Sequence, residues 1–203
     1  PRRAVDSLRS PLTPDVRLLT PHMSFHRQLL RLELGLVRWS ELPGFALSAL
    51  EEGLDSPALR ILAAYEFDRT NQDGIRVAYT QAREELQLVV PSRSESALLL
   101  LEALLTDIAS GLLEPYLGAK QIIDEIYDQG DWCNRNVRFV GDSLGIEALY
   151  GLADTIDDLL ESTHQWKPPR PNTELIAEAK AEIRAEASRL LATRPWRQPS
   201  GAA

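Results

Sequence analysis

A set of carboxylates with helical spacing lies between residues 147 and 161. Asp154, Asp157, Asp158 and Glu161 follow Glu147 at intervals of three, four and seven residues. In a helix with 3.6 residues per turn, side chains at these intervals project from one side. Such a group could bind Mg²⁺ or Ca²⁺, or it could present an acidic strip to a basic partner protein. The plain alternative is the solvated side of an amphipathic helix, whose apolar side would hold Leu149, Leu152, Ile156, Leu159 and Leu160.

The rest of the sequence offers little support for catalysis. No histidine or second carboxylate motif is placed to complete a metal site, because His22, His26 and His164 have no recognisable ligand arrangement. The chain also lacks a Walker-type phosphate loop, G-x-G-x-x-G, G-x-S-x-G, paired C-x-x-C and H-E-x-x-H. We therefore predict no catalytic residue, no cofactor and no resident metal ion. A divalent-metal-dependent enzyme that uses the carboxylates of residues 147–161 stays open as an alternative.

A second candidate contact surface lies in the irregular loop at 128–142, where the helical period is lost. The loop contains Trp132, Arg135 and Arg138, and tryptophan and arginine are common anchors of protein interfaces. The alternative is a tryptophan packed on the fold, with the arginines paired to nearby acids. Cys133 is a poor candidate for a nucleophile, because no histidine stands in a recognisable relation to it.

The element that must position these residues is the apolar run near 94–111. Its leucines surround the helix on nearly every side, which indicates burial or a membrane span. Glu102 and Asp107 fall inside the run, and acidic residues are costly at the centre of a bilayer. The sequence therefore predicts a buried central helix, with Ser92 and Glu95 as a capping box and Gly111 near its end.

Helical periodicity in most of the remaining chain predicts an all-α fold, a single bundle of about seven to eight helices around the central helix. Prolines and composition predict its organisation: an extended or flexible N-terminal arm over 1–22, a helical core domain over 23–166, a Pro-rich spacer over 167–172, and a C-terminal helix with a disordered tail over 173–203. The arm is either native or an extension appended before Met23.

Charge narrows the class of partner. The net charge of −8 disfavours nucleic acid, which needs a basic surface. No apolar run is suited to a membrane, and the single cysteine without an apolar leader favours the cytoplasm. We predict a non-enzymatic bacterial protein-binding module, such as an immunity or antitoxin-like inhibitor or a regulatory adaptor. It would capture a basic protein through Asp154, Asp157, Asp158, Glu161 and the loop with Trp132, Arg135 and Arg138. A structural subunit that self-associates through the C-terminal helix is the further alternative.

Overall fold

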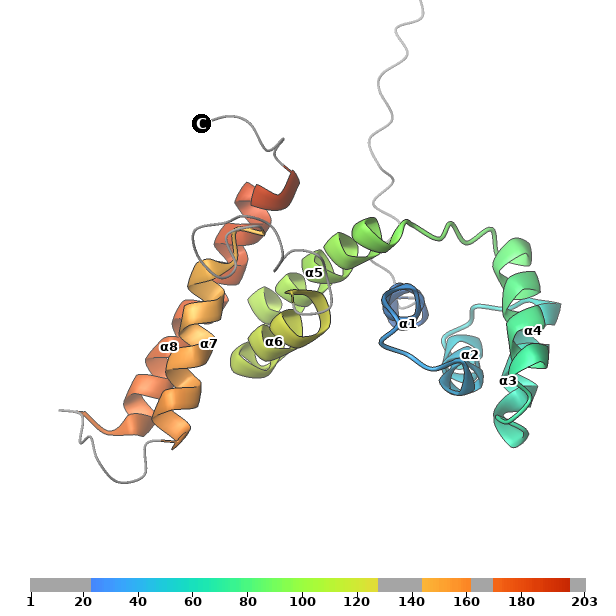
Figure 1. The fold of residues 1–203 in the computed structure, drawn as a ribbon, viewed down its shortest axis with the longest axis horizontal. Helices are drawn as coiled ribbons and strands as arrows, with labels where there is room; N and C mark the ends of the chain where they lie inside the picture. The colour runs from blue at the N-terminus through green and yellow to red at the C-terminus, as the bar shows by residue number, and fades with distance from the viewer. Residues whose placement is uncertain (1–22, 128–143, 162–169, 198–203) are drawn as a thin grey trace, which may run out of the picture. The chain divides into compact units, whose positions relative to one another are not determined.

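The computed structural model describes residues 23–127, 144–161 and 170–197 (Figure 1). Within these ranges the chain forms eight α-helices and no strand, which confirms the predicted all-α fold class. The helices are α1 (Met23–Leu34), α2 (Leu42–Glu51), α3 (Pro57–Ala64), α4 (Gln72–Glu85), α5 (Arg93–Ser110), α6 (Pro115–Ile122), α7 (Glu147–Glu161) and α8 (Asn172–Thr193). Short 3₁₀ turns occupy Trp39–Glu41, Tyr65–Phe67 and Pro195–Arg197, and a π-helical turn occupies Ile123–Tyr127.

The chain divides into two compact units. Unit 1 comprises Pro1–Gln28 and Trp39–Leu88, and unit 2 comprises Leu29–Arg38 and Val89–Ala203. This division falls inside the range 23–166 that the sequence analysis assigned to one core domain. The predicted boundaries of the arm, the spacer and the C-terminal segment stay a prediction.

Unit 1 is built around α3, which packs against both α2 and α4. The sequence starts α3 locally: the Ser56 hydroxyl accepts the backbone N–H of Leu59 at 3.1 Å, and Pro57 occupies the first helical position. A second contact in unit 1 joins Trp39 to Tyr79 and Arg76. The Trp39 ring meets Tyr79 edge-on at 5.5 Å between centroids, and the Arg76 guanidinium lies 5.2 Å from the Trp39 centroid. Leu42, Leu59, Leu62 and Ile75 of α2, α3 and α4 are fully buried, so unit 1 has an apolar core of its own.

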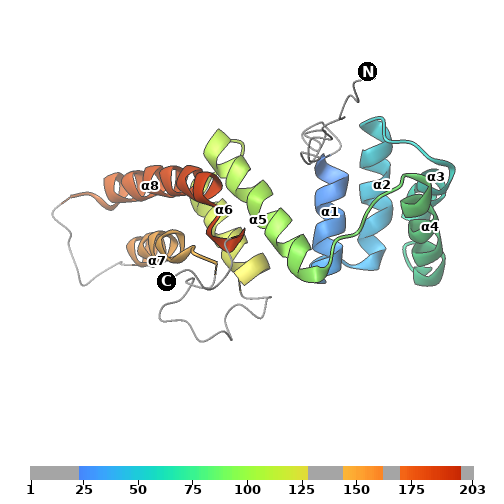
Figure 2. The same ribbon diagram turned by 90° about the horizontal axis from the view of Figure 1, so that it is seen from above.

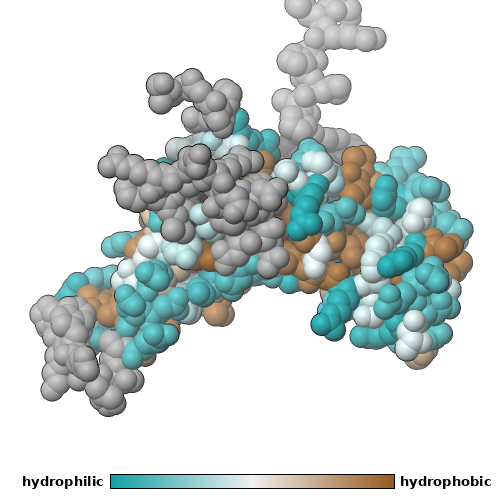
Figure 3. All heavy atoms as spheres, in the orientation of Figure 1, coloured by the Kyte–Doolittle hydropathy of each residue, from teal (hydrophilic) through white to brown (hydrophobic). Residues whose placement is uncertain are grey.

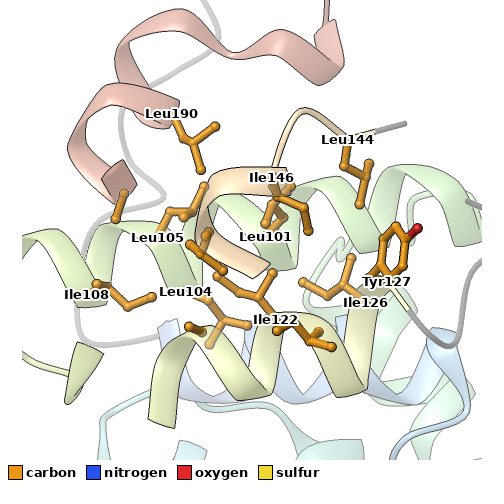
Figure 4. Packing of buried hydrophobic residues seen from close by; sticks show 14 of the residues in the cluster. Leu101, Leu104, Leu105, Ile108, Ile122, Ile126, Tyr127, Leu144, Ile146 and Leu190 are labelled. Carbon is orange, nitrogen blue, oxygen red and sulfur yellow. The ribbon is translucent and has the colours of Figure 1, made fainter. Parts of the chain in front are cut away.

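Unit 2 is organised around α5, as the apolar run predicted. The Ser92 hydroxyl accepts the backbone N–H of Glu95 at 3.4 Å, and Gly111 ends the helix with a left-handed φ of 80°. Both signals act locally, which explains why they are legible in the sequence. Buried side chains of α5 form one apolar cluster with residues of α6, α7 and α8. They include Leu100, Leu101, Leu104, Leu105 and Ile108, none of which is more than 1% exposed. Figure 4 shows part of this cluster, with Leu101, Leu104 and Leu105 of α5 near Ile122, Ile146 and Leu190.

Helix α6 approaches α5 closely at Gly118. A Cβ atom at this position would lie 2.5 Å from the Ile108 Cγ1 atom, so a larger residue would force the two helices apart. Helix α8 is joined to α6 by an ion pair between Lys180 Nζ and Glu114 Oε1 at 2.9 Å. The Glu114 carboxylate also accepts the backbone N–H of Leu117 at the start of α6.

Helices α7 and α8 lie side by side in both views (Figures 1 and 2), and α8 also packs on α5. The apolar stripe of α8 is therefore covered by the chain's own core: Ala179, Ile183, Ala187 and Leu190 are buried. Self-association through the C-terminal helix stays a prediction. Among the helices that the structure describes, none combines the length and the apolar character needed to cross a bilayer.

Candidate functional site: the acidic face of α7 and the groove beside α8

Helix α7 buries one side and exposes carboxylates on the other. Leu149, Ala153, Ile156 and Leu159 are buried. Asp154, Asp158 and Glu161 are exposed, and we call these three residues the acidic face. Within the described part of the chain, no hydrogen bond or ion pair involves their carboxylates. Figure 3 shows largely hydrophilic residues, with smaller apolar areas, on the visible side of α7 and α8.

Leu160 is a correction to the expected amphipathic pattern. The sequence placed it with Leu159 on the apolar side, yet Leu160 is 56% exposed whereas Leu159 is 8% exposed. Leu160 follows the buried Ile156 by four residues, so helical spacing puts both on the same side of α7. Its exposure shows that this side is no longer covered in the last turn of the helix.

Asp157 lies on a different flank of α7 from the acidic face. Its carboxylate accepts a hydrogen bond from the Tyr116 hydroxyl and pairs with Lys120 Nζ at 3.2 Å, so both partners come from α6. The hydrogen bond from Tyr116, together with the Lys120 charge, lowers the pKa of Asp157 below its usual value. Asp157 in turn raises the pKa of Tyr116 and of Lys120. The structure thus separates Asp157 from the three carboxylates with which the sequence grouped it.

The opposite flank of α7 borders a groove between α7 and α8. Its volume is about 640 Å³, and apolar side chains from both helices form its floor. Carboxylates stand along its edges: Asp158 from α7, and Glu178 and Glu182 from α8. The floor residues are Leu152, Leu159, Leu175 and Ala179, all buried or half-buried, and Thr155 is also among the described lining residues. We call this feature the α7–α8 groove.

The groove carboxylates differ in their pairing. Glu178 forms an ion pair with Arg170, in which Arg170 Nη2 lies 2.9 Å from Glu178 Oε2. Asp158 and Glu182 have no hydrogen bond or ion pair within the described residues. The groove is therefore bordered by two carboxylates whose charges no described side chain neutralises.

Two other carboxylates of unit 2, those of Glu102 and Glu125, are paired and can be compared with the acidic face. Glu102 on α5 accepts a hydrogen bond from Arg197 Nε at 2.8 Å and fastens the C-terminal 3₁₀ turn to the core. Glu125 in the π-helical turn accepts from Arg31 Nη2 at 2.7 Å and from Gln121 Nε2 at 3.1 Å. Both carboxylates are largely buried and both hold helices together, unlike those of the acidic face.

The sequence analysis missed Glu178, Glu182 and the groove itself. A weak signal was present, because Leu175 and Ala179 of α8 lie beside Glu178 and Glu182 on the helix surface.

Trp132, Arg135 and Arg138, together with the irregular loop at 128–142, lie outside the described residues, so their role as a contact surface stays a prediction. His26 is half-buried, and burial lowers its pKa.

In the ranges that the structure describes, no group of three or more His, Cys, Asp and Glu side chains is arranged to hold a metal ion. Comparison of the chain with protein-family models, with curated proteins and with solved structures gave no match. The geometry and charge of unit 2 are therefore the observations that bear on function.

Proposed function

We propose that this protein is a non-enzymatic interaction module that binds a basic partner protein through the acidic face of α7. The observation that carries the proposal is the contrast within one helix. Asp154, Asp158 and Glu161 are exposed and unpaired within the described residues, whereas Asp157 is held by Tyr116 and Lys120. The unpaired carboxylates are the ones available to a partner.

Helix stability gives no reason for two of these carboxylates. Asp158 and Glu161 lie in the last turn of α7, which contains no basic residue. The C-terminal end of a helix carries partial negative charge and disfavours anions nearby. Like charges three or four residues apart add a further small cost. Residues that break a local rule of helix design are expected at functional sites, and binding supplies such a function here.

An acidic surface on a protein with a net charge of −8 acts on association rate as well as on affinity. Its field attracts a basic surface from beyond contact distance, and this attraction weakens as salt screens it. Nucleic-acid-binding proteins are one class of protein with such a basic surface. We propose that such a module acts in the cytoplasm. Its role would be that of an inhibitor of the immunity or antitoxin type, or of a regulatory adaptor.

The test compares two variants with the same change in net charge. Asp154→Lys/Asp158→Lys reverses two charges of the acidic face, and Glu51→Lys/Glu84→Lys reverses two exposed charges of unit 1. Wild type and both variants serve as bait for affinity capture, and the captured partner is then titrated against each protein. We expect the acidic-face variant to bind at least about tenfold more weakly, with most of the loss in association rate at low salt.

The unit 1 variant is the matched control, because it changes the overall field equally but leaves α7 intact. Circular dichroism and melting curves establish that both variants keep their fold. Equal binding by wild type and the acidic-face variant would refute the proposal. Equal losses in both variants would also refute it, since they would show that net charge alone governs capture.

A further inference from the structure

The α7–α8 groove combines an apolar lining with carboxylates that favour a basic occupant. Its volume of about 640 Å³ is comparable to that of known ligand pockets, and the groove is partly open to solvent. The floor offers Leu152, Leu159 and Leu175 to apolar side chains of an occupant. The edge offers the carboxylates of Asp158 and Glu182. An occupant that fits both features is apolar on one side and basic beside it.

We propose that the α7–α8 groove binds a basic amphipathic helix of the partner protein. The inference deepens the proposed function, since it names the segment of the partner that the acidic region recognises. Asp158 connects the two surfaces, because it belongs to the acidic face and also lines the groove. Leucine-like side chains of the partner helix fill the groove, and its flanking lysines or arginines reach Asp158 and Glu182.

Charge selects this occupant over others. An apolar or acidic segment seated in the groove would remove Asp158 and Glu182 from water without supplying a partner, and burying an unpaired charge is costly. A second copy of this chain, which carries a net charge of −8, would add like charges at the same place. A basic side chain compensates both carboxylates and forms charge-assisted hydrogen bonds with them.

Backbone chemistry favours a helix over an extended peptide. The walls of the groove are two α-helices, α7 and α8, whose backbone groups are already used within the helices. An extended peptide that binds by adding a strand needs an exposed sheet edge for its backbone N–H and C=O groups, and no strand occurs in the described ranges. A helix satisfies these groups internally and presents apolar anchors at i, i+4 and i+7.

The test uses a designed peptide as the probe. The peptide has about 18 residues, leucines at i, i+4 and i+7, and lysines at the flanking positions. One control peptide keeps the leucines and replaces the lysines with glutamate, and a second keeps the lysines and replaces the leucines with serine. Binding to the full chain is measured by fluorescence anisotropy at low and at high salt. We expect the leucine–lysine peptide to bind at least about tenfold more tightly than either control.

Two variants of the protein locate the binding site. Thr155→Trp fills the groove without a change in charge, and Glu182→Lys reverses one edge charge. Each is expected to weaken binding of the leucine–lysine peptide about tenfold or more. Ala177→Trp, at an exposed position of α8 outside the groove lining, is the control for bulk, and Glu51→Lys is the control for charge. Neither control should change the dissociation constant more than about twofold.

The outcomes separate this inference from the proposed function. If Thr155→Trp and Glu182→Lys leave binding of the peptide and of the captured partner unchanged, the groove proposal is overturned. The proposed function still stands in that case if Asp154→Lys/Asp158→Lys abolishes capture of the partner. Equal binding of the lysine and glutamate peptides overturns the selection by charge. Concentration-dependent sedimentation of wild type that Thr155→Trp abolishes identifies a second copy as the occupant and also overturns the proposal.

Discussion

Neighbouring carboxylates on two flanks of α7 differ in their pairing. On the flank that faces α6, Asp157 accepts a hydrogen bond from Tyr116 and pairs with Lys120. On the flank that borders the groove, Asp158 is exposed and has no partner within the described residues. Adjacent acids of one helix thus serve different purposes: one holds two helices together, and the other is free to meet a partner. Local charge density does not distinguish them, whereas the neighbouring helix does.

The largest expected effect concerns a buried and an exposed apolar side chain of α7. Ile156 is fully buried and Leu160 is 56% exposed. Ile156→Ala is expected to lower the free energy of unfolding by about 2–5 kcal/mol, because it removes buried apolar atoms and leaves a cavity. Leu160→Ala should change it by less than about 0.5 kcal/mol. Urea denaturation followed by circular dichroism measures both values, and equal losses would contradict the difference in burial between Ile156 and Leu160.

The next test compares the two neighbouring acids directly. Asp157→Asn removes the charge that pairs with Lys120 and weakens the acceptor for Tyr116. We expect it to lower the free energy of unfolding by about 1 kcal/mol, a modest value because water partly screens the pair. Asp158→Asn should change stability by less than about 0.5 kcal/mol. The same urea denaturation experiment measures both changes. A larger loss of stability from Asp158→Asn than from Asp157→Asn would contradict the assigned roles of the two residues.

The contribution of Asp157 should also depend on pH. Its pKa in the folded protein is lowered from the usual 3.8, so ionised Asp157 stabilises the folded state above that value. This stabilisation is lost as the pH falls through the folded-state pKa. The difference in unfolding free energy between wild type and Asp157→Asn should therefore be constant above about pH 5 and shrink at lower pH. Denaturant titrations of both proteins across this range test the sign, and a difference that grows on acidification would refute it.

The smallest expected effect concerns the acidic face. Glu161→Gln removes a negative charge near the C-terminal end of α7 and near Asp157 and Asp158. It should raise the free energy of unfolding by a few tenths of a kcal/mol at low salt, because it relieves repulsion from like charges and from the helix dipole. High salt should remove this gain. A loss of stability in melting experiments at low salt would mean that Glu161 has a stabilising partner within the chain.

The sequence by itself determined the helices and many of their ends. The caps at Ser56 and Ser92, the first-turn Pro57 and the left-handed Gly111 act through contacts within a few residues, so they are legible without the fold. The buried α5 followed from its apolar period, and the exposure of Asp154, Asp158 and Glu161 followed from helical spacing. These features depend on local geometry, which residue order encodes directly.

Only the tertiary structure decided which surfaces meet. Asp157 finds its partners on α6, some 40 positions earlier in the chain, and Glu178 and Glu182 join Asp158 at the groove because α8 packs beside α7. The division into two units is likewise invisible in helical period. Such pairings depend on how apolar faces from distant segments share a common core, and no short stretch of sequence records that competition.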